Sequence, residues 1–292
     1  MNWLFFVEVV SSGLLAGFIT WLCVPAGNPW DLLENFQTSL LAVGIYSGMF
    51  MGLVSALPAL IVEKRLFKAG GYWISATSVG FAVSMMAAVI YAIFAEIVQE
   101  NIIVSPGLIR FSWWIIMSLS LSVCFAIIHH SLKIGCRALM GLTPGFLVAG
   151  TLLDRFFLIE QKWLLAYLFI GGITGSCLSL AWELLKESWL DEDSGGWLVY
   201  RYFIDGPEFI AGGLDECDIS IDGAPEHVFV ILEKEGLHTL EVIDDKEVIR
   251  VNNCRFRYRV LCDGDLITAG NRSFIYHSKL ARSRDILPEA AA

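Results

Sequence analysis

The stretch FIAGGLDECDISIDGAPEHVFVI, residues 209–231, decides the fold of the C-terminal part of this chain. Apolar residues recur at every second position, first at Ile219 and Ile221 and then at Val228 and Val230. A period of two is typical of half-buried β-strands. Gly, Asp and Pro separate these runs, and such residues favour turns because they accept or preset the backbone angles that turns need. The stretch therefore predicts short strands joined by tight turns in a compact β module.

The same pattern continues downstream, in VNN at 251–253 and in LCDGDLITAGNRSFIY at 261–276. The landmarks, taken in order, are the glycine pair before DECDISID, then His227, then VNN, then the Asp263-Gly264-Asp265 turn. In this order they resemble the forkhead-associated (FHA) domain, a β-sandwich that in its typical form binds phosphothreonine. The resemblance covers residues 197–279 and implies an all-β sandwich that recognises a protein partner.

Two positions depart from the FHA pattern where that family grips the phosphate. The family has a Gly-Arg pair after its first matching strand, and this chain has Gly212-Gly213; the family's serine is replaced by Ala224. A phosphate dianion is held by charge-assisted hydrogen bonds, which neither glycine nor alanine side chains can supply. The resemblance implies that His227 braces the loops and that Asn252 touches peptide backbone. The candidate partner-binding positions are Gly212, Gly213, Ala224, His227, Asn252 and Asn253.

Three arginines alternate in the segment CRFRYRV, at Arg255, Arg257 and Arg259. On a single strand all three would project from one face. Two interpretations stay open at this point. The arginines form a basic patch for an acidic partner, or they line a solvated face and pair with acids across the sheet.

The remainder of the chain has the composition of a membrane protein. The chain has 292 residues, is 56% hydrophobic and has a mean hydropathy of +0.63, well above the values of soluble domains. Six apolar segments are long enough to span a bilayer. They are residues 3–24, 39–62, 72–98, 108–132, 139–159 and 163–185. The fold class predicted from the sequence is an α-helical membrane bundle of about six helices followed by an FHA-like β-sandwich.

The charges between these segments predict the orientation. Lys and Arg follow the second segment at Lys64, Arg65 and Lys68 and the fourth at Lys133 and Arg137. Positively charged connectors favour the cytoplasmic side, so both termini and the β module are expected in the cytoplasm of an integral membrane protein of the cell or inner membrane.

Two features within the apolar segments lead to further expectations. Glu8 lies in the first segment, and we expect its carboxylate to reach the membrane interface. Pro144 and Gly145 interrupt the fifth segment, which leaves a re-entrant loop as an alternative to a full crossing.

Three pairs of glycines have the GxxxG spacing that lets helices approach closely in lipid. They are Gly48 and Gly52, Gly141 and Gly145, and Gly171 and Gly175. We expect these glycines to pack helices within the bundle, and the same spacing also fits a homo-oligomer interface.

The domain boundaries follow from the change in composition. They are a transmembrane domain at 1–189, an acidic linker at 190–196, the FHA-like module at 197–279 and a flexible tail at 280–292. Residues 191–292 carry 11 Lys and Arg against 20 Asp and Glu. So acidic a module does not favour nucleic acid as a partner. The seven cysteines form no CxxC pair, which argues against a zinc site or a disulfide framework.

No sequence motif of an enzyme is present: no P-loop, dinucleotide fingerprint, HExxH or nucleophile elbow. We therefore predict no catalytic residue, metal or cofactor. The sequence favours a membrane-anchored scaffold whose FHA-like module binds an unidentified cytoplasmic or membrane protein, with the lipid bilayer around its helices. The alternative is a transporter or channel with a regulatory FHA-like domain, which a buried polar path through the helices would favour.

Overall fold

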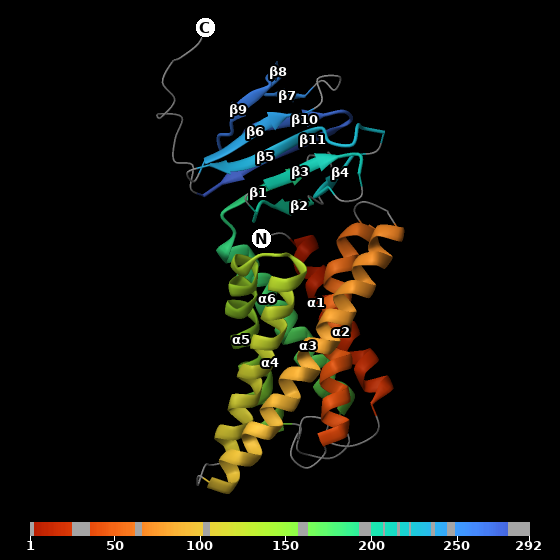
Figure 1. Cartoon of the computed structure of the whole chain (residues 1–292), viewed down its shortest axis with the longest axis vertical. Helices are drawn as coiled ribbons and strands as arrows, with labels where there is room; N and C mark the ends of the chain where they lie inside the picture. Colours follow the sequence, from red (N-terminus) through yellow and green to blue (C-terminus); the bar gives the residue numbers. More distant parts are fainter. Residues whose placement is uncertain are drawn as a thin grey trace. The chain divides into compact units, whose positions relative to one another are not determined.

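The structure is a computed structural model with two compact units, divided between Leu185 and Lys186 (Figure 1). It describes residues 3–24, 36–61, 66–101, 106–156, 163–192, 200–206, 208–214, 217–221, 223–234, 237–243 and 249–279. The first unit is helical and the second is built from β-strands. The predicted order of apolar helices followed by a β-sandwich is confirmed.

The helical unit has six described helices, each long and apolar enough to cross a membrane. They are α1 (Trp3–Cys23), α2 (Phe36–Ile61), α3 (Leu66–Asn101), α4 (Pro106–Ile128), α5 (Leu132–Phe156) and α6 (Trp163–Leu185). The fifth helix begins earlier than the sequence predicted and continues through Pro144. Proline removes one hydrogen bond from a helix, but lone prolines are tolerated in apolar helices that neighbours support. A re-entrant loop is therefore not formed.

The helices pack mainly on their neighbours in sequence, α2 on α3, α3 on α4, α4 on α5 and α5 on α6. Hydrogen bonds between side-chain hydroxyl groups also link the helices, both neighbouring and distant ones. The Tyr46 hydroxyl on α2 lies 2.8 Å from the Thr174 hydroxyl on α6, and Ser118 on α4 lies 3.0 Å from Thr143 on α5. Such pairs satisfy buried polar groups that lipid and apolar side chains would leave unbonded.

The prediction that the Glu8 carboxylate reaches the membrane interface is wrong. Its side chain is only 7% exposed, so the carboxylate lies inside the helical unit rather than reaching outward. Ser12, one turn further along α1, is fully buried and donates a hydrogen bond to the Glu8 carbonyl oxygen at 2.8 Å. The helical face that carries Glu8 is therefore the packed face of α1.

The β unit is a sandwich of two sheets (Figure 1). Its strands are β1 (Ser188–Glu192), β2 (Arg201–Phe203), β3 (Glu208–Gly212), β4 (Ile219–Ser220), β5 (Phe229–Lys234), β6 (Leu237–Val242), β7 (Arg250–Val251), β8 (Cys254–Arg255), β9 (Tyr258–Val260), β10 (Leu266–Ala269) and β11 (Arg272–Ser278). One sheet has the order β2-β1-β11-β10-β7-β8, and the other has the order β4-β3-β5-β6-β9. The β3–β4 pair is parallel, and the other described pairs are antiparallel.

The core of the sandwich is formed by side chains that both sheets turn inward. Those with no exposed surface include Leu190, Phe229, Ile231, Leu240, Ile267 and Phe274. Burying a side chain of this size contributes about 1.5–3 kcal/mol to folding. The alternation read from the sequence is thus real, although the centre of β5 is buried on both faces.

The predicted boundary between the two units is wrong. Residues 188–192 were assigned to the end of the helices and to the linker, but they form β1, which lies between β2 and β11. Ser188 and Leu190 are buried and Trp189 and Asp191 are half-buried, so this short strand alternates like the others. The rest of the predicted linker, 193–196, and the predicted tail, 280–292, lie outside the described residues.

The segment CRFRYRV is also not one strand. Cys254 and Arg255 form β8 in one sheet, and the chain then crosses at Phe256 and Arg257 to form β9 in the other sheet. The three arginines therefore do not share one strand face. Arg255 belongs to the six-stranded sheet, whereas Arg259 belongs to the five-stranded sheet.

Candidate functional site

The end of β3 lies directly against the loop before β5. A β-carbon added at Gly213 would overlap the carbonyl oxygen of Ala224 and lie 3.0 Å from that of Pro225. One added at Gly212 would overlap the carbonyl oxygen of Glu226. The Gly213 N–H donates a hydrogen bond of 2.6 Å to the Pro225 carbonyl oxygen, so the two backbones are held in contact. The space that the FHA pattern gives to an arginine side chain is filled by backbone.

The loop that carries Ala224 is a tight turn closed on itself. Gly223 has a φ of +75°, and the Ala224 N–H donates to the Ile221 carbonyl oxygen at 3.2 Å. Residues 224 and 225 are half-buried against β3 rather than raised from it. The loop therefore presents no hydroxyl at the position where the family has one.

His227 follows this loop and contacts Cys217, which precedes β4. The Cys217 Sγ lies 3.7 Å from His227 Nδ1 and 3.5 Å from the Glu226 carbonyl oxygen. His227 is half-buried and Cys217 is 2% exposed. The imidazole thus connects the two loops that flank β4.

Asn252 is bonded within the module. Its Nδ2 donates to Asp265 Oδ1 at 2.6 Å, and its Oδ1 accepts the Leu266 N–H at 2.9 Å. Asn252 and Asn253 have φ values of 52° and 65°, in the left-handed region that asparagine tolerates in tight hairpin turns. Asp265 is 3% exposed and also accepts the Cys262 N–H at 2.9 Å. In this structure Asn252 joins the β7–β8 turn to the start of β10.

The candidate positions fall into two groups at opposite ends of β10. The Asn252 N–H donates to the carbonyl oxygen of Leu266, where β10 starts. The loop after β4 lies at the other end, where a β-carbon on Gly270 would come 3.9 Å from Ile221. Four residues of strand separate the two ends, about 13 Å. The structure brings Gly212, Gly213, Ala224 and His227 together and leaves Asn252 and Asn253 apart from them.

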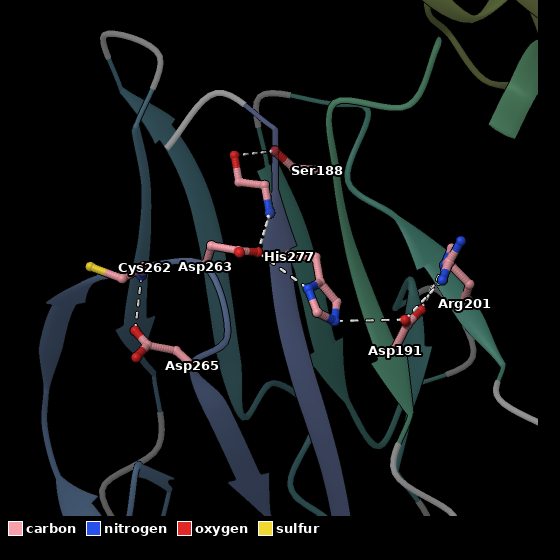
Figure 2. Close-up of polar contacts among 8 residues, drawn as sticks. Ser188, Asp191, Arg201, Cys262, Asp263, Asp265 and His277 are labelled. Carbon is pink, nitrogen blue, oxygen red and sulfur yellow. Dashed lines mark hydrogen bonds and ion pairs between the residues drawn. The ribbon is translucent and has the colours of Figure 1, made fainter. Parts of the chain in front are cut away.

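A second polar cluster lies on the six-stranded sheet (Figure 2). Arg201 on β2 binds Asp191 on β1 with both ends of its guanidinium, at 2.6 and 2.9 Å. His277 on β11 lies between two carboxylates, 3.2 Å from Asp263 and 3.7 Å from Asp191. Its ring stacks on Trp189 with 5.2 Å between centroids. These contacts join three neighbouring strands on one face.

Arg272 is a residue whose role the sequence did not reveal. Its guanidinium binds both carboxylate oxygens of Glu192 at 2.8 and 2.6 Å, the Tyr202 hydroxyl at 2.7 Å and the Ser220 carbonyl oxygen at 2.6 Å. Burial lowers the pKa of Arg272, but the hydrogen bonds and charge of Glu192 outweigh it, and the pKa is raised. Because Ser220 belongs to the other sheet, this arginine ties the two sheets together. Glu192 was read as part of a linker, and only its strand position makes this contact.

The glycines of α2 and α5 lie against neighbouring helices of the same chain. A β-carbon at Gly52 would overlap the Thr77 hydroxyl of α3, and one at Gly48 would lie 3.0 Å from the Thr77 carbonyl oxygen. Similarly, β-carbons at Gly141 and Gly145 would lie 2.8 and 3.0 Å from atoms of α6. All four sites are tighter than a side chain accepts without movement of its neighbour.

Among the described helices, α1 and α6 meet backbone against backbone, and the predicted glycine pairs included only the α6 side of this contact. A β-carbon at Gly171 would overlap the carbonyl oxygen of Gly13, and one at Gly13 would overlap that of Gly171. Gly175 approaches Val9, and Gly17 approaches Tyr167 in the same way. Gly13 and Gly17 have the same four-residue spacing as the predicted pairs, and that spacing was the signal that could have identified them.

Comparison with known proteins gives similarities to solved structures only. No family model matches the sequence, and no curated protein matches it. Among the described residues, no group of three His, Cys, Asp or Glu side chains is placed to hold a metal ion. All seven cysteines are free thiols.

The similar solved structures include FHA domains. One, described as the FhaA FHA domain complexed with the intracellular domain of Rv3910, is 21% identical over 31% of this chain and 99% of its own, with a TM-score of 0.29. The FHA domain of an Arabidopsis thaliana hypothetical protein is 17% identical over 32% and 86%, with a TM-score of 0.28. Mycobacterium tuberculosis EmbR in complex with a low-affinity phosphopeptide is 14% identical over 94% and 70%, with a TM-score of 0.29.

The C-terminal unit of this chain is a β-sandwich, and the landmarks by which its sequence resembles the FHA domain follow one another along its strands. The glycine pair ends β3, His227 precedes β5, and the Asp263–Asp265 turn precedes β10. The site at the end of β3 is built from backbone contacts and small side chains. Such a surface can recognise the shape of a partner, but it offers no cation to an anion at this point.

Proposed function

We propose that this chain is a membrane-anchored protein-interaction protein whose FHA-like module recognises its partner without reading phosphothreonine. The helical unit is the anchor, and the module is the part that binds. The observation that carries the proposal is the contact between Gly213 and the 224–225 backbone, because it fills the place of the phosphate-binding arginine.

The glycine packing of the helical unit supports an anchor rather than a transport path. Glu8 and Arg137 are the buried charged residues described in α1–α6, at 7% and 5% exposed. The remaining buried polar groups are hydroxyls, and several are bonded to a neighbouring helix, as Tyr46 is to Thr174. A coupled transporter needs clustered ionisable groups at the centre of its helices, and their scarcity favours the scaffold.

The proposal also places the module and both termini in the cytoplasm. The excess of Lys and Arg after the second and fourth apolar segments supports this orientation. A reporter that is active only in the cytoplasm should be active when fused after Lys279. A reporter that is active only outside the membrane should be active in the connector at 25–38. The reverse pattern would contradict this orientation.

The binding claim is tested by titration of the purified full chain in neutral detergent. Labelled phosphothreonine peptides and the same peptides without phosphate are compared by fluorescence anisotropy. We expect no preference for the phosphorylated form. Binding that depends on phosphate and is in the micromolar range would contradict the proposal.

A further inference from the structure

The free edge of the five-stranded sheet is a surface that the candidate site does not include. Among the described strands, β9 pairs with β6 alone and ends the sheet. The Val242 N–H donates to the Arg257 carbonyl oxygen at 2.9 Å, and the Leu261 N–H donates to the His238 carbonyl oxygen at 2.8 Å. Residues 257, 259 and 261 therefore turn their backbone groups toward β6.

In an antiparallel pair of strands, hydrogen-bonded and non-hydrogen-bonded residue pairs alternate. This alternation sets the direction of the backbone groups of residues 258 and 260. Tyr258 and Val260 are opposite Glu241 and Thr239 in non-hydrogen-bonded pairs, so their N–H and C=O groups point away from β6. Such an edge accepts another extended strand, and side chains next to it then select the partner. Tyr258 is 54% exposed and so is open to a partner at this edge.

Three cations surround the start of this edge, and we call Arg250, Arg255 and Arg257 the arginine corner. All three are exposed. Arg250 and Arg255 are directly opposite each other in the β7–β8 pair. Like charges in that position repel each other and destabilise the pair unless anions lie between them. No described acidic side chain forms an ion pair with Arg250 or Arg255, whereas Arg259 lies 3.5 Å from Asp265.

The charge of the corner is opposite to that of the rest of the module. Residues 191–292 carry 20 acidic against 11 basic residues, yet among the described residues that are exposed and charged beside β9, Lys234, Arg255 and Arg257 are basic and Glu241 is acidic. Phe256 and Tyr258 add exposed aromatic surface, at 39% and 54%. The edge therefore suits a partner that is extended, acidic and partly apolar.

We propose that β9 binds an acidic segment of another protein as an added strand, with the carboxylates of that segment on the arginine corner. The segment alternates carboxylate and apolar side chains, because alternate residues of a strand face opposite sides. A second copy of this chain is a poor occupant, since its β9 segment carries Arg257 and Arg259 and would bring cations rather than carboxylates to this edge. This inference deepens the proposed function, because it rests on the module binding a protein partner and names the class of that partner.

The test uses the full chain in nanodiscs of phosphatidylcholine. The probe is a fluorescein-labelled nonapeptide of alternating Glu and Val, and binding is measured by anisotropy. Two control peptides separate charge from strand addition. One has three consecutive central amides N-methylated, which removes the backbone donors and keeps every carboxylate. The other has Lys in place of Glu.

Two variants of the chain test the same two contributions. Arg255→Glu with Arg257→Glu removes the charge, and Lys279→Glu is the matched control at an exposed cation on the end of β11. Val260→Pro removes an N–H that points away from β6 and leaves the described β6 bonds in place. If the proline variant does not fold, the N-methylated peptide gives the same information.

The proposal expects the Glu-Val peptide to bind and its affinity to fall about tenfold or more with the double arginine variant, but not with Lys279→Glu. N-methylation and Val260→Pro should each abolish binding. Equal binding of the N-methylated peptide would overturn strand addition. No binding by the unmodified chain, self-association through β9, or displacement of the peptide by phosphatidylserine in the nanodisc would overturn the proposal as a whole. Phosphate-dependent binding of phosphothreonine peptides to the full chain in detergent would instead contradict the proposed function.

Discussion

The two units of this chain are stabilised by opposite means. In the helical unit the closest contacts are between backbones, where Gly13 and Gly171 leave no room for any side chain. In the β unit the contacts that join distant strands are made by long charged side chains, above all by Arg272 with Glu192 and the Ser220 carbonyl oxygen. In lipid there is little hydrophobic drive between helices, so close approach and dispersion take its place. In water the sandwich combines a buried core with charge-assisted hydrogen bonds at its margin.

The comparison predicts that the units respond differently to the same kind of change. Added bulk should disrupt the helical unit and have little effect on most of the sandwich surface. Loss of a charged group should disrupt the sandwich where that group joins strands.

The largest effect should come from moving the boundary of the β unit. A fragment of residues 186–279 should fold with a cooperative thermal transition, and a fragment of 195–280 should not. The shorter fragment lacks β1, which pairs with both β2 and β11 and brings the buried Leu190 and the Glu192 partner of Arg272. These losses are of the size of the whole stability of a small domain, about 5–15 kcal/mol. Circular dichroism melting of both fragments checks this, and a cooperative transition in the shorter one would mean that β1 is dispensable.

The second effect should come from bulk at the α1–α6 crossing. Gly171→Leu should lower the stability of the full chain in detergent by about 3 kcal/mol or more, because its β-carbon would overlap the Gly13 carbonyl oxygen. Gly172→Leu is the matched control on the same helix, where the nearest contact of a β-carbon is the flexible end of Leu14 at 3.4 Å. Size-exclusion chromatography after heating compares the two variants. Equal loss in both would show that leucine is harmful for reasons other than the crossing.

Much of the two-unit fold was predictable from the sequence. The contacts that were not predictable have one physical reason in common. The hydropathy of α1–α6 and the period of two around Ile219 are local signals, so the fold class followed from them. The assignment of β1 failed because its partner β11 lies nearly ninety residues away, as in the pairing of Trp189 with His277. A five-residue strand next to acidic residues carries too little local pattern to reveal such a partner.

The roles of single site residues depended on distant contacts in the same way. The loss of an arginine at Gly213 was visible in the sequence, but the backbone of residues 224–225 that closes on it was not. Asn252 was assigned to peptide contact by its place in the FHA pattern, and its bonds to Asp265 and Leu266 depend on how β10 begins. The alternation of Arg255 and Arg259 suggested one face, and the crossing between sheets separated them.

A smaller effect should come from removing the Arg272 guanidinium, which joins the two sheets. Arg272→Met should destabilise the β unit by about 2–4 kcal/mol, because the Glu192 carboxylate would stay half-buried without its partner. Arg255→Met is the matched control at an exposed arginine of the same unit and should change stability by less than about 0.5 kcal/mol. Limited proteolysis of the full chain in urea measures both. A similar midpoint for the two variants would show that Arg272 contributes nothing beyond an exposed arginine.

The smallest effect is expected where the sequence alone would suggest the largest. Gly213→Arg together with Ala224→Ser restores the two side chains that the FHA pattern uses for phosphate. Even so, we expect the affinity for phosphothreonine peptides to stay unchanged. An arginine β-carbon at 213 would overlap the Ala224 carbonyl oxygen, and the 2.6 Å hydrogen bond from the Gly213 N–H to Pro225 holds that loop in place. The side chain could enter only if the loop moved, and the gain from charge-assisted bonds of roughly 1.5–3 kcal/mol each would be offset by that movement.

The experiment compares the double variant, Ala224→Ser alone and the unmodified chain by anisotropy with phosphorylated and unphosphorylated peptides. Ala224→Ser is the control because it adds the hydroxyl of the FHA pattern and leaves Gly213 unchanged. A gain of phosphate-dependent binding of about tenfold or more in the double variant would show that the arginine alone was missing and that the loop yields easily. No gain would show that the loss of phosphate recognition lies in the backbone of the loop, where these two substitutions do not reverse it.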